Sequence, residues 1–252
     1  MGGEGGDPVR AEGAAAGEVT LDIQGLTKHF GGVTAVSNCS FRVPRNIVAG
    51  LIGPNGSGKT TLFNLLTGLL RSDGGDYFYK GEPMIGLTPH EIFERGISRT
   101  FQVIRVFREM TALENLVAVS RDGDLGEVRR RALELLDFVT LLRLKDEYAG
   151  NLSYGQQKLL EFVRALMSDP EVLLLDEPAA GVNRTLLNTL LDRIRQLRGQ
   201  GKTILIVEHD MKVVMGHCEK IFVLDYGELI AEGLPGEIQR NEQVIEAYFG
   251  HK

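Results

Sequence analysis

The sequence lacks the features that would tie it to a bilayer, a disulfide framework or a nucleic acid. Its longest apolar runs, such as Val172 to Leu175 and Ile204 to Val207, fall far short of the ~20 residues that a membrane-spanning helix requires. The two cysteines, Cys39 and Cys218, lie far apart without a CxxC pattern, which indicates neither disulfides nor zinc and fits a reducing, cytoplasmic setting. Lys and Arg number 28 against 34 Asp and Glu, a net charge of −6, so the cation surplus of a non-specific nucleic-acid binder is missing.

What remains is the composition of a soluble globular protein, with 43% hydrophobic and 25% charged residues in 252. This length allows one large domain or two small ones. Residues 1–18 are mostly Gly, Ala and Glu with almost no large apolar side chain. Such a segment cannot bury enough surface to offset its ordering entropy, so we expect a disordered tail followed by a folded region over residues 19–252.

The folded region shows the periodicities of an α/β protein. Alternating apolar residues from Val19 to Ile23, and the run Val33 to Val43 after a Gly-Gly pair, predict an antiparallel β layer. Uninterrupted apolar runs at 47–52, 172–175 and 203–207 are typical of strands covered on both faces in a mainly parallel sheet. Helices are predicted at 60–70, from 88 and 111, at 125–142 and 158–168, from 183 and at 235–249, with a hairpin over 221–231.

A glycine-rich segment with the spacing of a P-loop joins the first of these buried strands to a helix. The glycines let several N–H groups face one point, and the following helix adds the positive end of its dipole. Lys59 can reach the β and γ oxygens of a nucleotide, while the Thr60 hydroxyl suits a Mg²⁺ position. The strand before and the helix after argue against a chance match. The segment consists of Gly53, Pro54, Asn55, Gly56, Ser57, Gly58, Lys59 and Thr60.

Acidic residues end the second buried strand, where open α/β sheets place their ligands. Asp176 suits a metal held through water, and Glu177 can polarise or deprotonate an attacking water. His209 follows the next buried strand, so it shares this edge of the sheet with Glu177. The three residues complement a P-loop, which by itself is shared by kinases, GTPases and motor proteins.

A second helix N-terminus suited to anions opens at Ser153. Ser153 and Gln156 form an S-x-x-Q capping box, with the small residue Gly155 at the mouth of the helix. An isolated capping box is usually structural. Two helix N-termini suited to anions, nearly a hundred residues apart in one chain, however, call for a functional explanation.

In these segments the chain resembles the ATPase subunits of ABC transporters, from about Leu21 to the C-terminus. The motifs follow the family's order. They are the Walker A loop at 53–60, the Q-loop glutamine Gln102 in Arg99-Thr100-Phe101-Gln102, the signature at 152–156, Walker B with the catalytic glutamate at Asp176 and Glu177, the D-loop at 180–183, and the switch histidine His209. Phe30 falls where the family places an aromatic ring that stacks on adenine.

The resemblance implies a P-loop NTPase of the ABC ATPase fold over residues 19–252, with a mainly parallel core sheet, an N-terminal antiparallel β layer and a helical subdomain at 103–168. It also implies that two subunits pair head to tail around ATP and Mg²⁺. The catalytic residues are then Glu177, His209 and Gln102, and the metal is held by Thr60, Gln102 and Asp176. The nucleotide contacts are Phe30, the P-loop with Thr61, and Ser153, Gly155 and Gln156 toward the partner's nucleotide.

Further segments are similar to the ATPases of branched-chain amino acid importers. Tyr154 stands where many family members have glycine, and the C-terminal Val244-Ile245-Glu246-Ala247-Tyr248 matches this type. Arg184 departs from it, replacing the proline usual after Asn183, although Asn183 can still cap the next helix. The ATPases of urea import and of lipopolysaccharide export are close alternatives.

The resemblance also implies partners. A transport ATPase without a membrane span needs separate permease subunits, which we expect to dock near Gln102, Val103, Ile104, Val106 and Phe107 on the cytoplasmic face of the membrane. A second ATPase subunit, identical or a sister, and indirectly an extracytoplasmic binding protein complete the system. A soluble ABC-type assembly ATPase without a permease remains open, as does a small-molecule P-loop kinase, which would leave the signature segment and the switch histidine unexplained.

Overall fold

Two β-sheets organise the chain in the computed structural model, which describes residues 19–120 and 123–249 and therefore leaves the predicted tail at 1–18 outside the described residues. The antiparallel sheet has the order β2-β1-β4-β5, and the larger sheet the order β10-β9-β3-β8-β7-β6, parallel except for the β9–β10 hairpin. The strands are β1 (Val19–Phe30), β2 (Val33–Pro44), β3 (Val48–Ile52), β4 (Gly74–Tyr79), β5 (Glu82–Pro83), β6 (Ile97–Arg99), β7 (Val172–Asp176), β8 (Thr203–Val207), β9 (Lys220–Asp225) and β10 (Glu228–Gly233).

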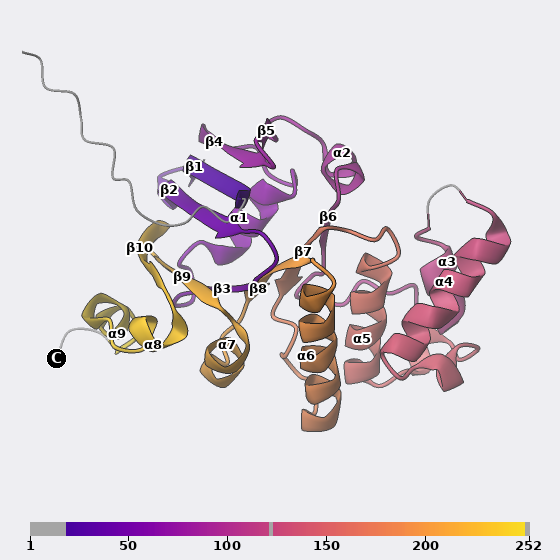
Figure 1. Cartoon of the computed structure of the whole chain (residues 1–252). Helices are drawn as coiled ribbons and strands as arrows, with labels where there is room; N and C mark the ends of the chain where they lie inside the picture. The colour runs from indigo at the N-terminus through magenta and orange to yellow at the C-terminus, as the bar shows by residue number, and fades with distance from the viewer. Residues whose placement is uncertain (1–18, 121–122, 250–252) are drawn as a thin grey trace, which may run out of the picture.

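Helices cover the larger sheet. In Figure 1, α1 lies with the antiparallel sheet on one side of the larger sheet, while α5, α6 and α7 lie on the other and α3 and α4 stand at the outer end. The helices are α1 (Lys59–Leu66), α2 (Pro89–Glu94), α3 (Ala112–Val117), α4 (Leu125–Phe138), α5 (Tyr154–Ala165), α6 (Arg184–Gly199), α7 (Met211–His217), α8 (Pro235–Ile238) and α9 (Glu242–Phe249).

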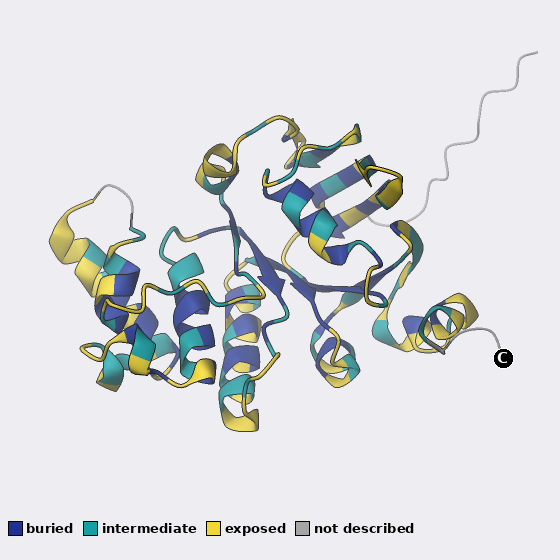
Figure 2. Ribbon diagram, turned by 180° about the vertical axis from the view of Figure 1, so that it is seen from behind, coloured by how far each residue is buried: buried dark blue, intermediate teal, exposed yellow. Residues whose placement is uncertain are grey.

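The larger sheet separates two hydrophobic cores. Val48 and Ile52 of β3 pack into the core under α5 and α6, whereas Ala49 and Leu51 pack into the core shared with α1 and the antiparallel sheet. Successive side chains of a strand point to opposite faces, so one apolar run supplies both cores. Figure 2 shows the central strands as continuously buried. The uninterrupted apolar runs therefore mark a sheet covered on both faces, as predicted from the sequence.

Several predicted boundaries need correction. The first predicted helix, 60–70, ends at Leu66, because Gly68 takes a φ of 67° and Thr67 Oγ1 donates back to Phe63 O at 2.7 Å. The predicted helix 125–142 ends at Phe138, and Thr140 has a φ of 62°. The final helix is two helices, α8 and α9, because Asn241 Oδ1 accepts from Val244 N and starts a new helix. Strands β4, β5 and β6 were not predicted.

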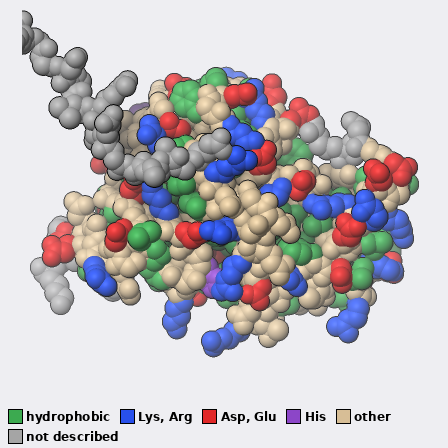
Figure 3. Space-filling model, viewed as in Figure 1, with side chains coloured by type: hydrophobic (Ala, Val, Ile, Leu, Met, Phe, Trp, Pro, Cys, Tyr) green, Lys and Arg blue, Asp and Glu red, His purple; other side chains and the backbone are tan. Residues whose placement is uncertain are grey.

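Three further features of the described residues are the charges on the surface, the length and apolarity of the helices, and the state of the cysteines. On the face seen in Figure 3, Lys and Arg side chains lie among Asp and Glu side chains. Within residues 19–120 and 123–249, no helix is both long enough and apolar enough to cross a bilayer. Cys39 and Cys218 are buried free thiols.

Candidate functional site

The phosphate loop connects β3 to α1 and is shaped by glycine. Gly53 has a φ of 154°, and a Cβ on it would lie 2.1 Å from Leu224 O. Gly58 caps α1 with a φ of 100°, and a Cβ there would lie 2.3 Å from Ala35 O. Both positions exclude any side chain, so the loop folds against β2 and β9 with its backbone free to turn around an anion.

Lys59 folds back over this loop. Its Nζ donates to Gly53 O at 2.9 Å, to Pro54 O at 2.8 Å and to Ser57 Oγ at 3.2 Å. Burial lowers the pKa of the Lys59 ammonium from its ordinary value, and the charges of Glu177 and Asp176 oppose that shift. The cation is thus held at the centre of the loop by neutral acceptors that an anionic phosphate can replace.

Glu177 lies between two side chains from other segments. Gln102 Nε2 donates to its Oε2 at 3.0 Å, and His209 Nε2 lies 2.9 Å from its Oε1. The backbone of Glu177 has a φ of 48°, an unfavourable conformation for a residue with a Cβ, and its N–H donates to Val207 O at 2.9 Å. The three residues predicted as catalytic therefore meet at one point, at the carboxyl ends of β7 and β8.

Asp176 presents one unpaired carboxylate oxygen. The side chain is 1% exposed, and Oδ2 pairs with Arg99 Nη2 at 2.7 Å, while Oδ1 is buried without a hydrogen-bond partner. An orphaned buried acceptor is costly unless something fills it, and carboxylate oxygens and waters are what Mg²⁺ prefers. The donor set of Asp176 and the exposed Thr60, in the first turn of α1, therefore fits Mg²⁺.

The signature segment forms the N-terminus of α5. Ser153 Oγ accepts from Gln156 N at 3.4 Å, and Gln156 Oε1 accepts from Ser153 N at 2.9 Å, so the predicted capping box is present. Ser153 is exposed and Gln156 is half-buried, and these hydrogen bonds join them to each other rather than to the phosphate loop. The Tyr154 ring lies against Gly181, where a Cβ would approach it to 2.7 Å. The signature segment thus packs on the loop between β7 and α6.

The remaining predicted nucleotide contacts differ in exposure. Phe30 ends β1 and is 48% exposed, with Lys28 Nζ 5.6 Å from its ring centroid. An open ring at this place suits stacking better than core packing. Asn55 and Gly56 are exposed, and Thr61 is half-buried on α1.

Three charged residues at the site were given no role by the sequence analysis. Glu208 is 3% exposed and accepts from Ala179 N at 2.7 Å and His209 N at 3.1 Å, and burial raises its pKa above the ordinary value. Arg99 holds Asp176, and Lys158 of α5 contacts the backbone at Gln102 and Glu177. Their only signal in the sequence is a charged residue beside or within an apolar run.

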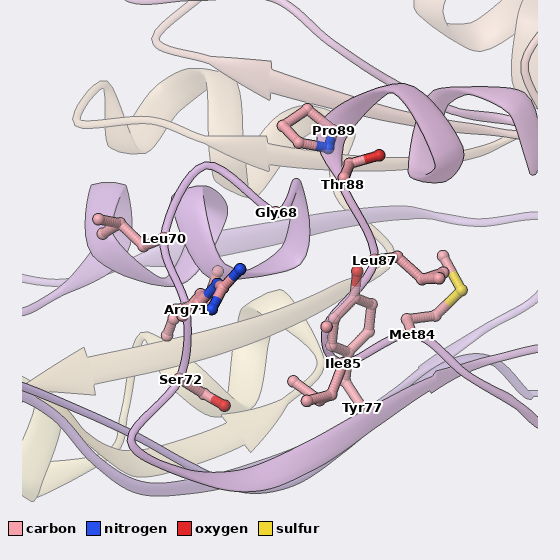
Figure 4. A pocket seen from close by; sticks show the side chains of 12 residues that line it. Gly68, Leu70, Arg71, Ser72, Tyr77, Met84, Ile85, Leu87, Thr88 and Pro89 are labelled. Atoms are coloured by element: carbon pink, nitrogen blue, oxygen red, sulfur yellow. The ribbon is translucent and has the colours of Figure 1, made fainter.

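One pocket of the described residues lies away from this site. It has a volume of about 500 Å³ and lies between the end of α1, β4 and the start of α2, as Figure 4 shows. None of the predicted site residues lines it. The position of the candidate site therefore follows from the motif residues and not from a cavity.

Comparison with known proteins agrees with this arrangement. The family model described as ABC transporter matches residues 36–180, and the model described as branched-chain amino acid ATP-binding cassette transporter matches residues 228–252. The high-affinity branched-chain amino acid transport ATP-binding protein BraF of Pseudomonas aeruginosa is 40% identical over 91% of this chain and 97% of its own length. LivG of Salmonella typhimurium, with the same description, is 41% identical over the same shares.

Solved structures give the same family. A nucleotide-free ATP-binding cassette from an ABC transporter superposes with a TM-score of 0.85 at 34% identity, covering 92% of this chain and 100% of that one. A dimeric bacterial ABC transporter cassette superposes with a TM-score of 0.78 at 26% identity, covering 85% and 98%. The chain therefore belongs to the ABC transporter family, as an ATP-binding ATPase subunit of the branched-chain amino acid type.

Proposed function

We propose that this chain hydrolyses ATP in a head-to-tail pair of ATPase subunits and thereby drives import of branched-chain or related amino acids. The observation that carries the mechanism is the position of Glu177, whose two carboxylate oxygens meet Gln102 and His209 beside the phosphate loop. A carboxylate held in this way is oriented to accept a proton from an attacking water. His209 then orients Oε1 of Glu177 and the groups around the transferred phosphate. Gln102 orients Oε2 of the same carboxylate.

The phosphate loop binds the nucleotide. Lys59 exchanges the carbonyls of Gly53 and Pro54 for phosphate oxygens, and the N–H groups from Asn55 to Thr61 surround the same anion. Phe30 stacks on the adenine.

Magnesium has a place beside the loop. Asp176 would hold the ion through water at its unpaired Oδ1, Thr60 through its hydroxyl, and Gln102 through its side-chain oxygen. When bound, Mg²⁺ neutralises the charge that develops on the phosphate oxygens.

The signature segment serves the nucleotide of the partner subunit. Ser153, Gly155 and Gln156 form a helix N-terminus that is exposed at Ser153, and its N–H groups and dipole suit a γ-phosphate. The dimeric arrangement of a related cassette supports this division of the site between two subunits.

We further propose that residues 19–252 form one ABC ATPase domain with a helical subdomain at 103–168, and that the chain works at the cytoplasmic face of the membrane with permease subunits. A pocket of about 380 Å³ beside the Q-loop contains Phe93, Phe101, Phe107 and Val119 with Arg105 and Arg164. Val103 nearby is 75% exposed. An apolar surface with basic residues at this place suits a permease loop. An extracytoplasmic binding protein supplies the cargo.

Substitution of the proposed base tests the chemistry. Glu177→Gln should bind Mg-ATP with unchanged affinity and lose turnover by about 10²–10⁴-fold, the usual contribution of a general base. Glu171→Gln is the matched control, since Glu171 pairs with Lys80 at the surface. Near-normal hydrolysis by Glu177→Gln would remove this role.

The transport assignment is tested separately. Membrane vesicles containing the chain with its permease subunits should take up labelled leucine, isoleucine or valine in an ATP-dependent manner, and Glu177→Gln should abolish uptake. ATP-dependent uptake of urea instead, or failure to co-purify with any polytopic membrane protein, would contradict the assignment.

A further inference from the structure

Lys158 lies inside the protein at the junction of three motifs. It belongs to α5, five residues after Ser153, and is 5% exposed. Its Nζ donates to Gln102 O at 3.3 Å and to Glu177 O at 3.1 Å. One ammonium group therefore joins the signature helix to the backbone of the proposed base, Glu177, and of Gln102, whose side chain contacts it.

Two further side chains of α5 bind the same loop. Glu161 Oε1 accepts from Arg105 N at 3.1 Å, and Arg164 Nη1 donates to Arg105 O. Lys158, Glu161 and Arg164 are spaced three residues apart, which places them along one side of the helix. The segment 102–105 is thus bound to α5 through its backbone, independently of its own side chains.

The burial of Lys158 has an energetic cost that packing alone does not explain. Burial lowers the pKa of this ammonium, while Glu161, Glu208, Asp176 and Glu177, in that order, oppose the shift. An apolar residue of similar length would fill the same space without desolvating a charge. Nevertheless, only a donor with several hydrogens can join two carbonyl oxygens from different loops.

We propose that Lys158 is a positioning residue that fixes Gln102 and Glu177 relative to the signature helix. The inference rests on the roles proposed above for Gln102 and Glu177, and it deepens them. Because α5 carries the signature segment at its N-terminus, a shift of α5 toward a partner's nucleotide moves both loops with it. The geometry of the base thereby depends on engagement of the other half of the site.

Removal of the ammonium should separate turnover from binding. In the full chain, Lys158→Met should lower kcat for ATP hydrolysis by about 10²-fold, the usual cost of displacing a catalytic group by 1 Å. Its Kd for a fluorescent ATP analogue should stay within about twofold, because the phosphate loop is untouched. Lys202→Met is the matched control, since Lys202 Nζ also donates to a backbone carbonyl, that of Asp169, and in addition pairs with the Asp169 carboxylate at the surface.

Two more variants keep the test valid if Lys158→Met folds poorly. Lys158→Met combined with Glu161→Gln removes the two opposite charges together and should show the same loss of kcat. Lys158→Arg retains donors that can reach both carbonyls and should recover kcat to within about tenfold of the wild type. A kcat within twofold of the wild type in either Met variant overturns the proposal, as does equal loss of kcat and of ATP affinity.

The position of the loop gives a second readout. The chain contains no tryptophan, so a single Val103→Trp substitution reports on the segment 102–105 alone. Lys158→Met should increase the fluorescence depolarisation of this tryptophan, and an unchanged anisotropy decay counts against the proposal. If Glu177→Gln hydrolyses ATP normally, the proposed function fails instead. If Glu177→Gln is inactive and Lys158→Met is active, this inference alone fails.

Discussion

Arg99 and Asp176 form an ion pair in the interior, with Nη2 of Arg99 2.7 Å from Oδ2 of Asp176 and with 6% and 1% of the side chains exposed. Arg99 also donates to Asn64 Oδ1 at 2.6 Å, and its guanidinium lies over the Phe63 ring at 5.5 Å. Since Phe63 and Asn64 lie on α1, one side chain of β6 links the helix after the phosphate loop to the acidic end of β7. The pair leaves Oδ1 of Asp176 buried and without a hydrogen-bond partner.

Loss of Arg99 should therefore be severe for stability. Arg99→Met leaves an uncompensated buried carboxylate, and breaking a buried pair in this way costs about 3–5 kcal/mol. Urea denaturation measures the loss. Arg130→Met is the control, because Arg130 pairs with Glu134 on the exposed face of α4, where such pairs contribute less than about 1 kcal/mol. Equal losses of unfolding free energy in the two variants would show that the buried ion pair contributes no more to stability than the exposed one.

Two glycine-to-alanine substitutions should change the stability of the chain in opposite directions. Gly58→Ala places a Cβ 2.3 Å from Ala35 O at a φ of 100°, so we expect lower stability and weaker ATP binding. Gly216→Ala adds a methyl group to the last turn of α7 with nothing within 4 Å, and it should stabilise the chain by about 0.4–1 kcal/mol. Thermal unfolding with and without ATP measures both effects. A stable Gly58→Ala chain with normal ATP affinity would contradict the proposed role of the loop's geometry.

Motifs and strand ends of the site were predicted from the sequence better than the side-chain contacts between its distant segments. The phosphate loop, the capping box at Ser153 and the placement of Glu177 and His209 at one sheet edge follow from local spacing, and the structure has them where the spacing puts them. Strand β6 escaped prediction because three residues carry no usable periodicity. The contacts of Arg99 with Asp176 and of Lys158 with Gln102 escaped it because each joins segments more than fifty residues apart in the sequence, which no local pattern encodes.

Stability should depend on pH through Glu161. Burial raises the pKa of this carboxyl above its ordinary value, so between the ordinary and the raised pKa the folded chain keeps a proton that the unfolded chain releases. This contribution to the free energy of unfolding is complete below the ordinary carboxyl pKa and is lost as pH rises through the raised value. The Glu161→Gln chain should lack this decline.

The comparison is made by urea denaturation of both chains from pH 4.5 upward. The difference in unfolding free energy, wild type minus Glu161→Gln, should decrease with rising pH. A difference that stays constant, or that increases, would contradict the stated direction of the pKa shift.

A mixing experiment tests whether two chains share each nucleotide. Lys59→Ala removes the cation from the phosphate loop, and Ser153→Arg fills the mouth of the signature helix, so each variant alone should lose hydrolysis. In a head-to-tail pair of the two variants, one site combines the intact loop of the Ser153→Arg chain with the intact signature of the Lys59→Ala chain. Mixing the inactive variants should therefore restore part of the ATPase activity, in proportion to the mixed pairs formed. Ser153→Arg should still bind ATP as a monomer, which shows that it is folded. Activity that stays absent at every mixing ratio, with both chains folded and dimers present, would mean that each site is completed within one chain.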